Sequence, residues 1–259
     1  MDQELSRVGN RRSAAGVCSG VETSELALIS ADQLADQLAC PSAGLPAAAR
    51  AQLLEVLTWL RSSIAKPNPL IGRKGHVCPF VGPGLARFRS IRFHVYQGEL
   101  RPAAVEPVLR ALAARFPTLP PATEAGREFR AILTLFPELP NDAGPVLIDP
   151  VQQALKAEIT AQGLMIGQFY PGCLEPGLHN LDYRPLEAPY PMLVLRPMQL
   201  TDLMFLVSRP EYLLAYVRRF GLASRDDLMA RVAAAGIPKL PTNWEAIVDA
   251  AYPPKANGG

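Results

Sequence analysis

The sequence predicts an α+β or α/β fold, in which helices pack on a mixed sheet of about four or more strands and a helical part completes the C-terminal end. Segments with the alternating or continuously apolar pattern of strands are interleaved with segments that carry a helical apolar stripe. Clustered prolines, among 26 in the chain, separate these segments, because proline interrupts helices and central strands. Beyond residue 200 the patterns are helical.

Length and composition predict one folded domain with two less structured ends. A chain of 259 residues with 49% apolar and 19% charged side chains can bury a substantial core. Residues 1–25 are polar and contain glycine and serine, so we expect a flexible N-terminus. We expect a single α+β domain over residues 26–245 and a C-terminal tail over 246–259.

In the first half, a short helix is expected over residues 30–39 and a longer one over 46–65. The longer helix has an apolar stripe at spacings of four, three and four residues, formed by Leu53, Leu57, Leu60 and Ile64. Residues 91–96 alternate between apolar and polar side chains, as a strand does. The next helix starts near Pro102, and its stripe consists of Val105, Leu109, Leu112 and Phe116.

In the second half, three more strands are expected, over residues 129–136, 164–170 and 191–197. The first of these is continuously apolar, which favours an interior position. A helix is expected over 149–162, with Asp149 as N-cap and Pro150 at the first helical position. Further helices are expected over 202–207, 211–220 and 224–235, the last with Ser224 as N-cap.

Two polar stretches concentrate the side chains that carry chemistry. Gly72–Phe80 joins a helix to a strand and holds a cysteine, a histidine and two cations. Tyr170–Pro185 separates the last two strands and holds a cysteine, a histidine and an arginine. We expect the fold to bring the two stretches together to form one pocket.

Cys78 is the first candidate site residue. A thiolate binds soft or borderline metals and heme iron, and Arg73 and Lys74 nearby favour the thiolate form. The alternative is that Cys78 is a small buried hydrophobic residue. His179 is either an axial ligand or proton shuttle near neutral pH, or a loop histidine bonded to a backbone carbonyl.

Four further residues complete the candidate set. His76 is a candidate catalytic residue, and His94, on the polar face of a strand, faces either a cofactor cavity or solvent. Arg184 and Arg196 flank the last strand, where guanidinium groups would hold a carboxylate or a heme propionate, or remain surface cations. Four zinc-ligand types, at a spacing that matches no familiar zinc motif, are offered by His76, Cys78, Cys173 and His179.

Charge and missing motifs disfavour several function classes. The formal net charge of +2 is too small to predict a nucleic-acid partner. No apolar run of eighteen or more residues predicts a membrane span. The N-terminus lacks a signal-peptide pattern and the four cysteines form no CxxC pair, so we expect a cytoplasmic protein. Without GxGxxG, P-loop, HExxH, GxSxG or EF-hand motifs, nucleotide chemistry and serine hydrolysis are disfavoured.

Parts of the sequence resemble known families. The block His76–Val81, the strand at 91, the phrase Gly163–Tyr170 and the residues from Pro176 to Leu206 are similar to a bacterial domain family of unknown function. That family is often found near biosynthetic genes, and the similarity covers roughly residues 65–220. The layout also resembles heme-dependent oxygenases of the YqcI/YcgG type, which have a Pro-Cys loop before the first strand and a late His/Arg/Pro-rich loop.

The second resemblance implies a heme-dependent monooxygenase that oxidises nitrogen in a small amine or amino acid of a biosynthetic pathway. Cys78 stands in the first loop, in the order Cys-Pro, and His179 with Arg184 stands in the late loop. Cys78, or alternatively His179, would ligate the iron. With Cys78 as the ligand, His179 would relay protons, and Arg184 or Arg196 would anchor a propionate or the substrate carboxylate.

Such an enzyme needs a small-molecule substrate and a redox partner, and a homodimer is compatible with the sequence. Two alternatives stay open at this point. One is a cofactor-free small-molecule-binding or accessory protein of a biosynthetic pathway. The other is a zinc-binding protein.

Overall fold

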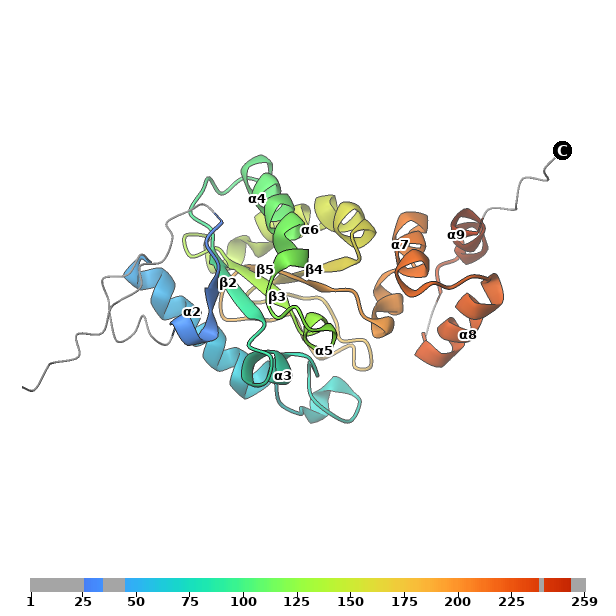
Figure 1. Ribbon diagram of the computed structural model, residues 1–259, viewed down its shortest axis with the longest axis horizontal. Coiled ribbons are helices and arrows are strands. Elements are labelled where there is room, and N and C mark those ends of the chain that lie inside the picture. Colours follow the sequence, from blue (N-terminus) through green and yellow to red (C-terminus); the bar gives the residue numbers. More distant parts are fainter. Residues whose placement is uncertain (1–25, 35–44, 238–239, 253–259) are drawn as a thin grey trace, which may run out of the picture.

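The computed structural model describes residues 26–34, 45–237 and 240–252, which form a mixed five-stranded sheet with helices packed on it (Figure 1). The expected flexible segment 1–25 and most of the expected short helix over 30–39 lie outside the described residues, although residues 31–34 are helical. The predicted α+β class is confirmed. Within the described residues, no helix is long and apolar enough to cross a membrane.

The sheet has the strand order β1-β2-β3-β5-β4. Strands β2 and β3 are parallel, and the other neighbouring pairs are antiparallel. All four predicted strands are present, and the continuously apolar one, β3, is central as expected. The bounds are β1 Ile29–Ser30, β2 Ile91–Val95, β3 Ala131–Leu135, β4 Leu164–Phe169 and β5 Met192–Pro197. The edge strand β1 was not predicted, because two residues are too few to show a pattern.

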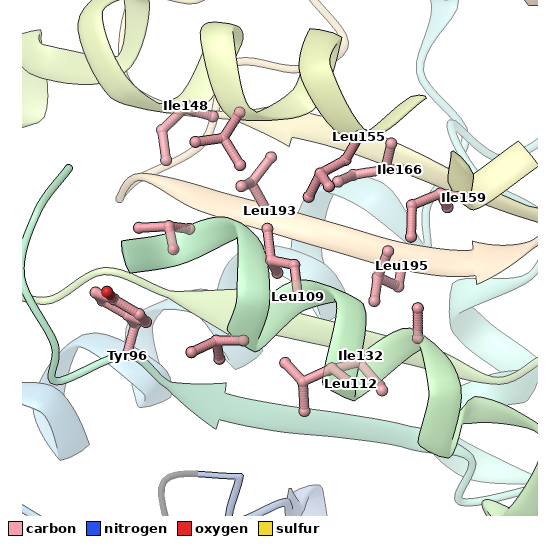
Figure 2. Close-up of a cluster of buried hydrophobic side chains, with 14 of the residues drawn as sticks. Tyr96, Leu109, Leu112, Ile132, Ile148, Leu155, Ile159, Ile166, Leu193 and Leu195 are labelled. Atoms are coloured by element: carbon pink, nitrogen blue, oxygen red, sulfur yellow. The ribbon is translucent and has the colours of Figure 1, made fainter. Parts of the chain in front are cut away.

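Helices α4 (Pro102–Arg115) and α6 (Gly144–Ala161) cover one face of the sheet (Figure 1). The predicted stripe of α4 is fully inside this layer, and side chains of α6 meet β3, β5 and β4 beside it (Figure 2). Because this face is covered by helices, even a polar side chain of β2 that lies on it is buried: His94 is 1% exposed.

Helix α2 (Ala47–Trp59) and the short α3 (Val81–Ala86) cover the other face (Figure 1). The predicted leucine and isoleucine stripe of α2 is buried against β2 and β3, so this prediction is confirmed. The last part of the stripe lies in a π-helical continuation, Leu60–Ile64, where the N–H of Ala65 bonds the carbonyl of Leu60 at 2.8 Å.

Three C-terminal helices form a further core cluster at one end of the sheet (Figure 1). They are α7 Pro210–Phe220, α8 Arg225–Ala235 and α9 Trp244–Ala251. Ser224 caps α8 as predicted. Residues 246–251, which we assigned to a tail, belong instead to α9, because Ile247 and Val248 are buried in this cluster. Residues 253–259 lie outside the described part of the chain.

The start of α6 differs from the prediction. The helix begins at Gly144, so Asp149 is not its N-cap and Pro150 lies inside it. Pro145 takes the first-turn position, where a missing N–H costs nothing. Pro150 removes the bond to the carbonyl of Val146, a residue that is 76% exposed, so water can hydrate that carbonyl.

Short helical turns make the remaining connections. They are η2 Pro69–Ile71, η3 Phe116–Thr118, α5 Glu124–Arg127, η4 Asn141–Ala143 and η5 Leu200–Phe205. The predicted helix over 202–207 corresponds to η5, a 3-10 helix.

Candidate functional site

The two polar stretches predicted to carry chemistry lie against each other. A Cβ atom on Gly72 would be 2.5 Å from the carbonyl oxygen of His179, so only glycine permits this approach. The side-chain amide of Asn180 donates a hydrogen bond of 2.8 Å to the carbonyl of Leu70. The expected meeting of the two stretches is therefore present in the structure.

Each stretch is also folded back on itself. In the first, Pro67 and His76 form an antiparallel bridge, and the N–H of Val77 bonds the carbonyl of Lys66 at 2.9 Å. In the second, the N–H of Gly177 bonds the carbonyl of Tyr183 at 2.8 Å. These bonds hold the two loops in defined positions on the sheet.

Cys78 is a free, half-buried cysteine at the end of the first stretch. Its N–H bonds the carbonyl of Ile64 at 2.9 Å, which ties it to the π-helical end of α2. The side chain packs against the core cluster on the α2 side of the sheet. It is also within electrostatic range of Arg196, whose pKa it helps to raise.

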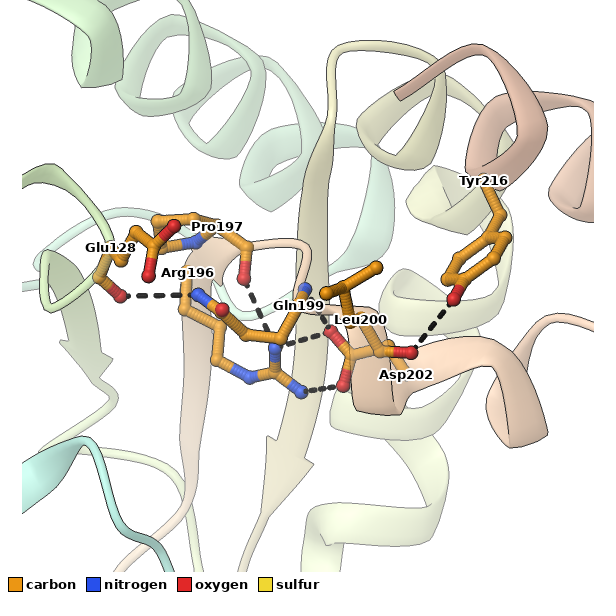
Figure 3. A network of polar contacts seen from close by, with 7 residues as sticks. All are labelled: Glu128, Arg196, Pro197, Gln199, Leu200, Asp202 and Tyr216. Atoms are coloured by element: carbon orange, nitrogen blue, oxygen red, sulfur yellow. Dashed lines mark hydrogen bonds and ion pairs between the residues drawn. The ribbon is translucent and has the colours of Figure 1, made fainter. Parts of the chain in front are cut away.

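Arg196 pairs with Asp202 through two hydrogen bonds of 2.6 and 2.7 Å (Figure 3). Burial lowers the pKa of Arg196, but the bonds to the carboxylate more than offset this and the pKa is raised overall. The same carboxylate accepts the N–H of Gln199 at 2.7 Å. Arg196 thus anchors η5 to β5 and is already engaged by a carboxylate of the protein itself.

The other predicted residues differ from Cys78 in their surroundings. His76 and His179 are exposed, and His94 is buried on the opposite face of the sheet, under α4 and α6. Arg184 is half-buried and donates to the carbonyls of Leu181 and Tyr183, the latter at 3.2 Å, so it stabilises its own loop.

The four zinc-ligand residues predicted from the two stretches do not come together. Cys173 is buried in the core cluster on the α4 and α6 side, whereas Cys78 packs on the α2 side. Burial raises the pKa of the Cys173 thiol, although bonds from Glu175 and Tyr170 oppose this rise. Among the residues that the structure describes, no group of three or more His, Cys, Asp or Glu side chains can hold a metal ion.

A shallow hollow of about 380 Å³ runs along the exposed side of α2 and its π-helical end. Its lining combines an indole and an aliphatic side chain with one carboxylate and three hydroxyl groups, from Leu54, Glu55, Thr58, Trp59, Ser62 and Ser63. Departures from α-helical geometry of this kind occur frequently at functional sites. The volume is at the lower end of the range for small-molecule sites, about 300–1,000 Å³.

Side chains from the end of β4 and from the connection between β4 and β5 contact the lining of this hollow. Tyr190, just before β5, donates a hydrogen bond of 2.8 Å to the carboxylate of Glu55. That bond, followed by burial, raises the pKa of Tyr190. Trp59 contacts Phe169 edge-on with ring centroids 6.1 Å apart, so neighbouring groups fix the positions of both the carboxylate and the indole.

The hollow along α2 does not fit a heme ligated by Cys78. Such a heme needs an apolar cavity that opens toward the sulfur. Cys78 packs into the core cluster beside the Arg196–Asp202 pair, and the lining of the α2 hollow contains no thiol and no imidazole.

Our prediction from the sequence did not use a long segment that has basic residues but no acidic ones. Residues 56–98 contain seven lysines and arginines but no aspartate or glutamate. Asp32 pairs with one of them, Arg89, at 3.4 Å. Within the described residues, no ion pair involves Arg61, Lys66, Arg73, Lys74 or Arg87, all of which are exposed.

The model of a domain of unknown function, DUF6875, matches residues 53–231. The match covers more than half of the chain and includes strands β2 to β5, both polar stretches and the lining of the hollow, so the chain belongs to this family. Searches of curated proteins and of solved structures find no match.

Proposed function

We propose that the domain is a cofactor-free protein that binds a small, positively charged amine in the hollow along α2. The observation that carries this proposal is the combination of the Glu55 carboxylate with the Trp59 indole in one hollow. Of the functions that the sequence suggested, this corresponds to the small-molecule-binding protein of a biosynthetic pathway. The proposed ligand is a small nitrogen-containing metabolite, the same class as the substrate expected for the oxygenase.

The chemistry of the lining favours an amine over an acid. A carboxylate attracts an ammonium group and accepts its N–H donors, and the face of an indole stabilises a cation within about 6 Å of the ring centroid. Hydroxyl groups of Thr58, Ser62 and Ser63 add acceptors along the same helix face. The Thr58 hydroxyl already donates to the carbonyl of Leu54 at 2.9 Å, which leaves its lone pairs free for a ligand donor.

Calorimetric titration with a panel of amines tests the proposal. Putrescine, agmatine, phenethylamine and arginine are compared with alcohols and carboxylic acids of similar size. We expect at least one amine to bind and the acids not to bind. The substitution Glu55→Gln keeps the side-chain shape but removes the charge, and it should weaken amine binding roughly tenfold to hundredfold, because hydrogen bonds to charged groups contribute about 1.5–3 kcal/mol.

Glu138→Gln is the matched control, since Glu138 is an exposed carboxylate in the connection between β3 and η4. It should bind the amine as the unchanged protein does. Absence of binding by every amine, or equal binding by the Glu55→Gln variant, would contradict the proposal.

The heme-dependent oxygenase is the competing hypothesis. The half-buried cysteine Cys78, near Arg196, is the observation in its favour, because cysteine sulfur is a ligand of heme iron. The two hypotheses predict different absorption spectra, because a heme protein has a Soret band and a cofactor-free protein does not.

A further inference from the structure

A second surface of the domain combines exposed leucines with cations that form no ion pair with any residue that the structure describes. Leu70 is 61% exposed and Leu181 is 71% exposed, and Leu178 is 39% exposed. Single exposed apolar residues are common on protein surfaces. Here, however, the leucines come from two polar stretches that the Gly72–His179 contact and the Asn180–Leu70 hydrogen bond hold together.

The cations of this surface come from the acid-free part of the sequence. Arg73 donates to the carbonyls of Lys74 and Val77, both at 3.1 Å, so its guanidinium is held on its own loop and not by a carboxylate. Lys74 is exposed beside it. The carboxylate of Asp182 contributes one negative charge nearby. We call the surface formed by Leu70, Arg73, Lys74, Leu178, His179 and Leu181 the two-loop face.

We propose that the two-loop face binds an acidic, amphipathic segment of a partner protein. Carboxylates of such a segment pair with Arg73 and Lys74, and its apolar side chains cover the exposed leucines. A second copy of this chain that uses the same face is disfavoured as the occupant, because it would bring its own Arg73 and Lys74 against the same cations.

Charge and composition also separate a protein segment from other anionic partners. Binding of single-stranded nucleic acid relies on aromatic side chains on which bases stack, and the two-loop face is defined by leucines instead. Recognition of anionic membranes typically uses clusters of about four to eight Lys or Arg, whereas this face has two. A segment with few carboxylates and several apolar residues fits the face best.

Fluorescence anisotropy with a defined probe tests the proposal on the full chain. The probe is a labelled helical peptide of about 18 residues, with leucine on one face and glutamate on the other. We expect saturable binding that weakens as salt is raised from about 50 mM to about 500 mM, because added salt screens exposed charges. The variants Arg73→Glu with Lys74→Glu, and Leu70→Ser with Leu181→Ser, should each weaken binding about tenfold.

Arg218→Glu is the matched control, because Arg218 is an exposed arginine in the last turn of α7, outside the two-loop face. This variant should bind the probe as the unchanged protein does, and circular dichroism should show that all variants remain folded. The proposal is overturned if the peptide does not bind or if both double variants bind it unchanged. Tighter binding of a lysine-for-glutamate version of the peptide, of single-stranded DNA or of vesicles with phosphatidylglycerol would overturn it as well.

Discussion

The α-carbon of Gly72 packs directly against the carbonyl group of His179, with a backbone φ of 73° at the glycine. Alanine at position 72 would therefore carry two penalties: a left-handed conformation and a Cβ atom 2.5 Å from an oxygen. We expect Gly72→Ala to lower the free energy of unfolding by more than the roughly 1–2 kcal/mol of the conformational penalty alone. Urea denaturation measures this change.

Gly221→Ala separates the two penalties. Gly221 has a similar φ of 62°, but nothing lies within 4 Å of a Cβ at that position. The difference between the losses in free energy of unfolding of Gly72→Ala and Gly221→Ala then measures the cost of the close contact with His179. Equal losses of stability would show that the two stretches separate at little cost.

The pair of Arg196 and Asp202 should be a main determinant of stability. The Asp202 side chain is only 4% exposed, and the side chain of Arg196 is 31% exposed. We expect Asp202→Ala to lower the free energy of unfolding by about 3 kcal/mol, the lower end of the range for breaking a buried pair, because the arginine keeps some contact with water. Chemical denaturation with the Glu211→Ala variant as control checks this.

Glu211 forms an ion pair with Arg209 in which both side chains are largely exposed, at 3.6 Å. Loss of such a pair changes stability by at most about 1 kcal/mol. Similar effects of the two substitutions would show that the Arg196–Asp202 pair contributes no more than a surface contact.

Tyr170 should make stability depend on alkaline pH. Burial, and then its 2.8 Å hydrogen bond to Asp149, raises the pKa of Tyr170 well above its ordinary value. The pKa of Tyr170 is higher in the folded state than in the unfolded state. Its contribution to the free energy of unfolding is therefore complete below about pH 10, the pKa of an unfolded tyrosine. It is lost as the pH rises further and the unfolded state releases its proton.

We therefore expect the free energy of unfolding of the unchanged protein to fall above pH 10 more steeply than that of Tyr170→Phe. The difference in slope should be up to about 1.4 kcal/mol per pH unit. Denaturant titrations at a series of pH values measure it. Parallel curves for the two proteins would contradict the assigned environment of Tyr170.

The absorption spectrum distinguishes the proposed amine-binding protein from a heme oxygenase. Because Cys78 packs into the core cluster and does not line the hollow, we expect no Soret band after expression with a heme precursor. A stoichiometric Soret band that shifts in Cys78→Ser would favour the oxygenase with a thiolate ligand. A band that shifts on substitution of His179 instead would identify the imidazole as the ligand.

Apolar periodicity correctly predicted the helices that bury a single face against the sheet. The stripes of α2 and α4 were identified residue by residue, because each helix buries one face against the sheet. The start of α6 was misplaced because two prolines are compatible with a first helical turn, and the sequence does not say which one occupies it. Gly144 begins the helix where the ring of Tyr170 leaves no room for a side chain.

The environment of the candidate site depends on contacts between distant parts of the chain. The alternation in β2 placed His94 on a polar face, but α4 and α6 cover that face, and His94 lies next to the buried Thr134 in the sheet. The proximity of Cys78 to Arg196 joins the two halves of the chain. Residue spacing carries no information about either arrangement, although the meeting of the two polar stretches was predicted.

The position of β5 has a consequence for how the chain completes its fold during synthesis. β5 is the last strand in the sequence, yet it lies between β3 and β4 in the sheet. It pairs with β3 along one edge and with β4 along the other. A nascent chain that ends before residue 192 has an open edge on β3 and no place for β4 to attach, and exposed edges of this kind promote aggregation. Ribosome-bound or truncated chains should therefore depend on chaperones until this final strand has emerged.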